Sequence, residues 1–421
     1  MEKEKKMKKN VELYGRYKAF SFDWLFYYAI IFLFFTQTKG INAADVLLAE
    51  SLYPIFKIIF LIPATVLINS VGKRKSLIIG NFFNVLAIIV YIASMNFITI
   101  IIGELLSAIG FIIKGICESN ILYDSLENNE KRGIRFAKIE GKSISIYYYI
   151  EAISSIISGL LFVVNGYIPM IMCLVITIFS TYLSTKFKNI DEKRKINFKE
   201  IKLECSELLS SFKLIRKSLR LKNLILFGAF ISAIMLSITM LRSSIMQEIG
   251  IPAQYFGLIF AILGLISGIT AKNASRFHKR FRNRTLAFLA IPLVISFIIL
   301  GSVCTINISY SINVIIILMM FLIQYIVKGP FHPLIKQYLN NFTDTKLRTK
   351  ISSLFNLLEN LLRFLITFIA SNLLRYTTTS NTFIFLGITL TIIVILMLKN
   401  MKNKVGLKPE EYSQRDIKFL N

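Results

Sequence analysis

Histidine and cysteine are scarce in this chain of 421 residues, and their scarcity excludes several kinds of site. The two histidines are His278 and His332, which excludes a histidine-rich catalytic or metal centre. Three of the four cysteines lie within or at the ends of apolar runs, and Cys205 lies in a basic connection. This pattern is neither a disulfide framework nor a metal site. We therefore expect no bound metal and no cofactor.

Acidic residues are also few: 24 Asp and Glu face 50 Lys and Arg, for a formal net charge of +26. Such a balance would suggest a nucleic-acid or anionic-surface partner if the cations shared one face of a folded domain. They lie instead in the short connections between apolar runs, as in proteins that retain positive charge on the cytoplasmic side during membrane insertion. The charge therefore predicts membrane topology, and we expect no nucleic-acid partner.

Sequence motifs of enzymes are absent as well. The chain has no phosphate-binding glycine loop, no metal cluster and no nucleophile beside a base, so we expect no enzymatic activity. The lysine-rich start, Met1 to Asn10, is followed by polar residues and by no small-residue cleavage site, so we expect no cleaved signal peptide.

Apolar residues make up 55% of the chain, and charged residues only 18%. Apolar runs of about 18 to 25 residues recur, each long enough to cross a hydrocarbon layer of roughly 30 Å as a helix. We place spans at 20–38, 44–68, 76–95, 98–123, 143–165, 168–186, 222–245, 253–272, 285–304, 309–330, 351–373 and 381–399. The sequence thus predicts an all-α polytopic membrane protein with twelve transmembrane helices.

A single membrane topology of these spans places every basic connection on the cytoplasmic side. With a cytoplasmic N-terminus, the basic connections within 72–75, 128–142, 186–222, 272–284 and 332–350 and the tail from Lys399 all face the cytoplasm. The opposite connections are nearly free of Lys and Arg, with Lys39 and Arg375 the main exceptions. We expect a multi-pass protein of the cytoplasmic membrane with both termini in the cytoplasm.

The longest connection divides six spans from six. We expect a cytoplasmic segment 1–19, a six-helix bundle 20–186, a linker 187–221, a second six-helix bundle 222–399 and a cytoplasmic tail 400–421. Apolar residues from Phe198 to Phe212 recur at near-helical spacing among charges, which predicts an amphipathic helix in the linker. Two bundles joined in this way are typical of repeat transporters.

The connection after the second span contains Asn69-Ser70-Val71-Gly72-Lys73-Arg74-Lys75. It resembles the loop between helices 2 and 3 of the major facilitator superfamily, Gly-x-x-x-Asp-Arg-x-Gly-Arg-Lys, in which the Asp pairs charges at the cytoplasmic face. Gly72, Lys73 and Arg74 match the end of that pattern, whereas Asn69 replaces the Asp. An asparagine can accept a capping hydrogen bond but cannot form the ion pair.

Two further stretches resemble the same family. Residues Gly115 to Leu126, Gly-Ile-Cys-Glu-Ser-Asn-Ile-Leu-Tyr-Asp-Ser-Leu, are similar to the end of helix 4 in a bacterial, drug-exporter-like branch. Residues Leu339 to Asn341 with Arg348 to Leu354 resemble the family's entry to helix 11. The region around Ser155 to Gly159 lacks the proline of the antiporter motif.

The resemblance implies a monomeric secondary transporter that moves a small molecule by alternating access, coupled to protons or another ion. Proton-coupled efflux is the first expectation. Uptake of a sugar, peptide or siderophore by symport is the alternative, and a non-transporting membrane scaffold or sensor is a candidate from another class.

Ionisable residues inside apolar runs cost about 2.5 to 3.5 kcal/mol on insertion scales, so they usually face a cavity or a partner. The candidates for proton coupling are Glu151, Glu118 and Asp23. Glu151 has no basic residue within one helical turn, although it could pair with Lys57 or Lys114 of another helix.

The candidates for lining a cavity or forming a gate are Lys114, Glu359, Arg363, Gln324 and Tyr27. Lys114 and Glu118 are four residues apart, as are Glu359 and Arg363, so each pair shares a helix face and could also be a self-satisfied ion pair.

Some polar positions are expected to be structural. Glu104 and Arg242 fall towards the outer ends of their spans, where long side chains can reach water. Gly329 and Pro330 are expected to end the helix of span 10, with a hinge as the alternative.

Overall fold

The computed structural model describes residues 2–127, 132–189, 219–281, 284–306, 309–341 and 345–404. The amphipathic helix expected between Phe198 and Phe212 lies outside these residues, as does most of the tail. Every regular element in the described part is a helix. The chain divides into two compact units, Met1–Ile201 with Pro252–Ala261 and Lys202–Ile251 with Ile262–Asn421.

The helices of the first unit cover the six spans expected in the first half. They are α1 (Glu2–Ser21), α2 (Ile31–Leu33), the π-helix η1 (Phe34–Thr38), α3 (Ala43–Val71), α4 (Lys73–Ala93), α5 (Phe97–Asp124), α6 (Arg132–Val164) and α7 (Tyr167–Thr185).

The helices of the second unit cover the remaining spans, with one additional short helix. They are α9 (Leu219–Glu248), α10 (Gln254–Lys272, whose first turns belong to the first unit), α11 (Ala274–Phe281), α12 (Thr285–Thr305), α13 (Tyr310–Asn341), α14 (Thr345–Tyr376) and α15 (Thr379–Lys404).

Eleven of the described helices are long and apolar enough to cross a membrane, and they coincide with the second to twelfth predicted spans. The first span is present but interrupted: α1 ends at Ser21 and helical structure resumes at Ile31. The prediction of an all-α polytopic protein with twelve spans in two bundles is confirmed, and the first helix begins at Glu2, earlier than the span expected at 20–38.

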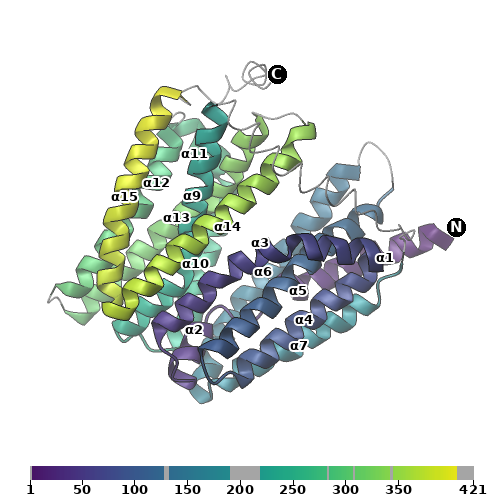
Figure 1. Cartoon of the computed structure of the whole chain (residues 1–421), viewed down its shortest axis with the longest axis horizontal. Coiled ribbons are helices and arrows are strands. Elements are labelled where there is room, and N and C mark those ends of the chain that lie inside the picture. Colours follow the sequence, from purple (N-terminus) through teal and green to yellow (C-terminus); the bar gives the residue numbers. More distant parts are fainter. Residues whose placement is uncertain are drawn as a thin grey trace. The chain divides into compact units, whose positions relative to one another are not determined.

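The N-terminal helix packs inside the first unit because its aromatic residues join the core. Tyr14 and Tyr17 of α1 are fully buried in a cluster with Leu77 of α4, Cys117 of α5 and Phe187. Figure 1 shows α4 between α5 and α7, an arrangement in which α5 also contacts α3.

The close approach between α4 and α5 occurs at Gly80 and Gly110, whereas Gly115 lies outside it. A Cβ atom on Gly110 would lie 2.2 Å from Oδ1 of Asn84 and 2.8 Å from the carbonyl oxygen of Gly80. A Cβ atom on Gly115, further along α5, would meet no atom within 4 Å.

These two positions give a matched test of helix packing. Gly110→Ala is expected to lower the free energy of unfolding by about 1 to 3 kcal/mol, because the new methyl group forces α4 and α5 apart. Gly115→Ala is expected to raise it slightly, by up to about 1 kcal/mol, because alanine favours the helix. Thermal unfolding of the purified variants in one detergent checks both, and equal shifts would contradict the close approach.

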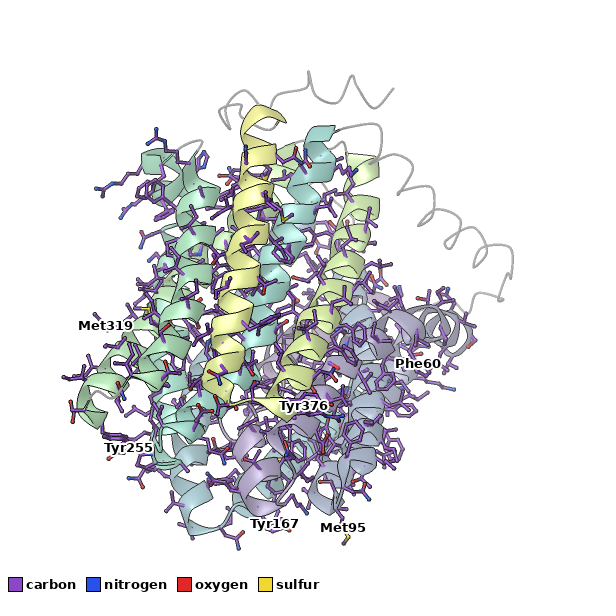
Figure 2. The ribbon with its side chains drawn as sticks, turned by 60° about the vertical axis from the view of Figure 1, so that its left-hand side comes forward. Phe60, Met95, Tyr167, Tyr255, Met319 and Tyr376 are labelled. Atoms are coloured by element: carbon purple, nitrogen blue, oxygen red, sulfur yellow. The ribbon has the colours of Figure 1, made fainter. Side chains whose placement is uncertain are left out.

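In the second unit, α9 is the central helix. In the most apolar stretch of α9, 83% of the residues are buried, whereas 22% are buried in the corresponding stretch of α14. It contacts α13, α14 and α15, while α12 packs against α13 and α15 (Figure 1). Large apolar side chains cover the outside of the helices, such as Met319, which is 55% exposed and projects outward in Figure 2. Such a surface suits contact with lipid.

The expectation that Gly329 and Pro330 end the tenth span is wrong. α13 continues through Pro330 and Pro333 to Asn341. Prolines are tolerated in transmembrane helices because neighbouring groups satisfy the freed backbone. Gly329 has a packing role, since a Cβ atom there would lie 2.1 Å from Oγ1 of Thr270 on α10.

Candidate functional site

The first span is broken where it carries its acidic residue. Residues 22–30 form no regular helix, and Phe26 has a positive φ of 63°. The Asp23 carboxylate accepts hydrogen bonds from the backbone N–H of Trp24 at 2.8 Å and from the hydroxyl of Tyr28 at 2.8 Å. An aspartate that binds nearby groups in this way competes with helical hydrogen bonding. Irregular backbone at membrane depth is tolerated only where protein or a water-filled cavity surrounds it.

The end of α1 is attached to α5 through Glu118, which is 1% exposed. One carboxylate oxygen accepts hydrogen bonds from the hydroxyls of Tyr17 at 2.8 Å and Ser21 at 3.2 Å. The other forms a salt bridge with the buried ammonium group of Lys18. Glu118 therefore has both oxygens engaged by one turn of α1.

A second carboxylate and an amide complete this buried group. The Lys18 ammonium group also lies 3.7 Å from Oε1 of Glu140 on α6, which accepts a hydrogen bond from Tyr14 through its other oxygen. Asn81 of α4 donates to the Tyr17 hydroxyl at 2.9 Å. We call Tyr17, Lys18, Glu118 and Glu140 the α1 cluster. It joins α1, α5 and α6 around one lysine and two carboxylates, and Asn81 connects it to α4.

Lys114 lies one turn from Glu118 on α5 and binds the break itself. Its ammonium group donates to the carbonyl oxygen of Ser21 and reaches that of Phe22 at 3.5 Å, and it lies 4.4 Å above the ring of Phe111. The last carbonyls of a helix lack intrahelical partners, so a cation placed there stabilises the helix end. The salt bridge of Glu118 is thus formed with Lys18 from another helix, while Lys114 serves the end of α1.

Asp23 lies among aromatic rings and two lysines. Lys114 and, more weakly, Lys57 act on its charge. Phe22 packs against the rings of Tyr147 and Tyr148 of α6 at centroid distances of 5.0 and 5.9 Å. The broken segment therefore contributes a carboxylate to a polar and aromatic surface shared with α3, α5 and α6. We call Asp23, Lys57, Lys114 and Tyr147 the span-1 site.

Glu151 lies one turn beyond this aromatic pair on α6 and is half-buried. Its charge acts on the hydroxyls of Tyr147 and Tyr148, as does that of Asp23. Glu151 is thus on the same helix as the two tyrosines against which Phe22, the neighbour of Asp23, packs. Glu118 belongs to the α1 cluster beside them.

Tyr27 occupies a packing position rather than an open one. It is 4% exposed, and its ring lies 4.6 Å from that of Trp24 and 6.0 Å from that of Tyr91. Glu104 is 5% exposed and acts on both tyrosines electrostatically, so the expectation that Glu104 reaches water is wrong.

The loop that resembles the family signature forms its contacts within the first unit. Gly72 joins α3 to α4 with φ of 89° and ψ of 151°, a conformation suited to glycine. Lys73 pairs with Asp124 at the end of α5, and Arg74 donates to the carbonyl oxygen of Thr185 at 2.8 Å. Asn69 is exposed. The carboxylate that the loop itself lacks is therefore supplied by Asp124.

In the second unit, the remaining candidates form two groups. Arg242 is 1% exposed, so the expectation that it reaches water is wrong. Its Nε donates to Oε1 of Gln324 at 2.8 Å, its guanidinium carbon lies 4.7 Å from the centre of the Tyr325 ring, and Gln324 donates to Ser296 at 2.9 Å. This chain of contacts joins α9, α12 and α13.

The second group surrounds Glu359 of α14. The Ser232 hydroxyl donates to its carboxylate and lies 3.5 Å from Nδ1 of His332. The backbone carbonyl of Arg363, one turn along α14, accepts from Ser237 at 3.4 Å. Glu359 and His332 are thus linked through one serine of α9.

Sequence reasoning selected Glu118 and Lys114 but missed Lys18, Tyr17 and Glu140. Lys18 was counted with the polar N-terminal segment, and Glu140 with a cytoplasmic connection. A signal was nevertheless present in α1: Asn10, Tyr14, Tyr17 and Ser21 recur at helical spacing among the charges, and all four are buried. Among the described residues, no group of three His, Cys, Asp or Glu could hold a metal ion.

Comparison with known proteins identifies the fold. The family model of the Major Facilitator Superfamily matches residues 19–367, while no curated protein matches the chain. A crystal structure of the nucleoside transporter NupG superposes with a TM-score of 0.71 at 8% identity, covering 96% of this chain and 100% of that one.

Two structures of peptide-type transporters are similar as well. A peptide transporter POT in complex with sulfate gives a TM-score of 0.70 at 12% identity over 95% of each chain. A POT family transporter in complex with 5-aminolevulinic acid gives 0.64 at 13% identity, over 94% of this chain and 96% of that one. At such identities the likeness concerns the fold. Together with the family match and the eleven apolar helices, it means that this multi-pass membrane protein belongs to the Major Facilitator Superfamily.

Proposed function

We propose that this chain is a secondary active transporter that moves a small polar molecule across the cytoplasmic membrane by alternating access, coupled to protons. The observation that carries the proposal is the break in the first span at Asp23, where Lys114 binds the carbonyls of Ser21 and Phe22 and Phe22 packs against the tyrosines of α6. Transporters commonly build substrate and ion sites from discontinuous helices near the middle of the membrane.

The α1 cluster supports a proton as the coupling ion. The Glu118 carboxylate accepts hydrogen bonds from Tyr17 and Ser21 and forms a salt bridge with Lys18, and the salt bridge depends on the negative charge of Glu118. Protonation of Glu118 would weaken the attachment of α1 to α5, and α1 leads directly into the span-1 site. A buried carboxylate in a membrane protein is costly unless it has such a role or such a partner.

The direction of transport has two candidates. Proton-coupled efflux by antiport follows from the resemblance of residues Gly115 to Leu126 to a drug-exporter-like branch. Uptake by symport is favoured by the charges of the span-1 site. Asp23, Lys57 and Lys114 suit a polar solute, such as a nutrient, better than an apolar one. Nucleosides and short peptides are the first substrates to test, because NupG and POT are named for them. The chain is proposed to act as a monomer with both termini in the cytoplasm.

Transport by the purified protein in proteoliposomes tests the proposal. We expect a pH gradient to drive accumulation of one of these solutes in the proteoliposomes. Accumulation with the acidic side outside indicates symport, and accumulation with the acidic side inside indicates antiport. Glu151→Gln is expected to reduce gradient-driven accumulation more than tenfold, because the amide cannot bind and release a proton, while solute exchange without a gradient persists. Glu127→Gln, at an exposed carboxylate, is the control.

Two results would contradict the proposal. Accumulation that ignores the pH gradient would exclude protons as the coupling ion. Accumulation by Glu151→Gln equal to that of the wild type would remove Glu151 from the mechanism.

A further inference from the structure

The short helix α11 was not expected from the sequence, and it presents a group of cations between two transmembrane helices. Arg276, Lys279 and Arg280 of α11 are exposed, as are the flanking Lys272 and Arg284. The helix is held against α13 by a hydrogen bond of 2.6 Å between Nδ1 of His278 and the Tyr338 hydroxyl. Because α10 and α12 are both long enough to cross the membrane, α11 must lie at its boundary.

Aromatic rings continue from α11 onto the outer surface of α12. The ring centroids of Phe277 and Phe281 are 4.6 Å apart, and those of Phe281 and Phe288 are 4.4 Å apart. Phe288 is 47% exposed, so this row of rings ends on a surface suited to hydrocarbon. The cations and the rings together form an amphipathic site with a charged end and an apolar end.

Some basic residues of the first unit have carboxylate partners. Lys73 and Arg132 pair with Asp124, and Arg135 pairs with Glu127. The sequence contains no Asp or Glu between Glu248 and Asp344, so α10, α11, α12 and α13 supply no carboxylate. The ion pairs found among the described residues include none of the α11 cations. Positive charge alone would serve membrane topology, whereas a concentrated charge beside an apolar row fits a ligand.

We propose that α11 and the start of α12 form a binding site for an anionic phospholipid of the adjoining leaflet. The lipid phosphate lies against Arg276, Lys279 and Arg280, whose side chains donate charge-assisted hydrogen bonds to its oxygens. An acyl chain packs along the rings of Phe281 and Phe288. Basic clusters beside transmembrane helices attract anionic lipid in this way, and a free phosphate would leave the apolar part of the site unused.

Lipid binding to the full chain in detergent, followed by native mass spectrometry, tests this site. Phosphatidylglycerol and phosphatidylcholine with identical acyl chains are offered at equal concentration. The variant R276Q/K279Q/R280Q is compared with R135Q/K138Q/K142Q, which removes three exposed cations of α6 and changes the net charge equally. We expect the wild type to retain phosphatidylglycerol in preference, and the α11 variant to lose about fivefold in apparent affinity for each cation removed.

The control variant is expected to change the affinity for phosphatidylglycerol less than twofold. Equal losses in the two triple variants, or no preference in the wild type, would overturn the proposal. Displacement of phosphatidylglycerol by an equal concentration of inorganic phosphate would also overturn it, because the ligand would then be a free anion. If the triple variant does not fold, Arg280→Gln carries the same test with an expected loss of about fivefold. The Phe288→Ala variant is expected to weaken phosphatidylglycerol binding without any change of charge.

Discussion

Glu118→Gln is expected to stop proton-driven transport and to destabilise the first unit. The substitution leaves the ammonium group of Lys18 buried, with Glu140 at 3.7 Å as its remaining carboxylate. Breaking a buried ion pair by removing one partner costs about 3 to 5 kcal/mol. Thermal unfolding in detergent and gradient-driven accumulation in proteoliposomes measure the two effects. The exposed pair of Glu127 and Arg135 provides the control, since Glu127→Gln should cost at most about 1 kcal/mol.

A double variant separates stability from coupling. Lys18→Met combined with Glu118→Leu replaces the buried pair by apolar side chains, a change that is often neutral or stabilising. We expect this variant to unfold near the wild-type temperature yet to show no proton-driven accumulation. Accumulation at the wild-type level in the double variant would mean that the pair only supports the fold. Wild-type stability in Glu118→Gln itself would contradict the buried salt bridge.

Arg242→Ala is expected to be the most destabilising substitution in the second unit. Arg242 of α9 is buried against Gln324 and Tyr325 of α13, and its loss leaves both a cavity and the Gln324 amide without its donor. Truncating a large buried side chain costs about 3 to 5 kcal/mol. Arg276→Ala, at an exposed arginine, should change the free energy of unfolding by no more than about 0.5 kcal/mol.

The cost of leaving the Gln324 side chain without its hydrogen-bond donor can be measured separately from the cost of the cavity. Arg242→Met keeps most of the volume but leaves the Gln324 carbonyl oxygen unsatisfied, for an expected loss of about 1 to 3 kcal/mol. Adding Gln324→Leu to Arg242→Met should recover part of that loss, because no orphan acceptor remains. Thermal unfolding of the wild type, Arg242→Ala, Arg242→Met and the double variant in the same detergent measures these differences. Similar stability of Arg242→Ala and Arg276→Ala would show that Arg242 is solvated.

Spans and their boundaries could be predicted from the sequence to within a few residues for most helices, such as α5, predicted at 98–123 and observed at Phe97–Asp124. The start of α6 and the end of α13 extend beyond their predicted spans, and the first span differs in kind because it is interrupted. Its sequence is apolar and contains no glycine or proline between residues 20 and 38, so periodicity gave no sign of a break. The break depends on Asp23 and on Lys114 of another helix, which compete with helical hydrogen bonds in that segment.

Partners of the buried charges could not be predicted. Glu118 and Lys114 share a helix face, and local spacing left open that they neutralise one another or act in coupling and gating. Lys18, which forms the salt bridge with Glu118, lies a hundred residues earlier in the chain. Arg242 was expected to reach water because of its place near a helix end, but it is 1% exposed and contacts Gln324 and Tyr325 of α13.

The sequence by itself determined that this protein is helical, that it crosses the membrane, and which residues carry charge at membrane depth. It did so because each span must satisfy its own backbone within one contiguous apolar run, a local requirement that composition and spacing record. Only the tertiary structure decided where the first span opens, which lysine holds Glu118, and that α11 places its cations beside a row of phenylalanines. These features depend on contacts between helices distant in sequence, and the energy of a buried charge depends on its neighbours in space.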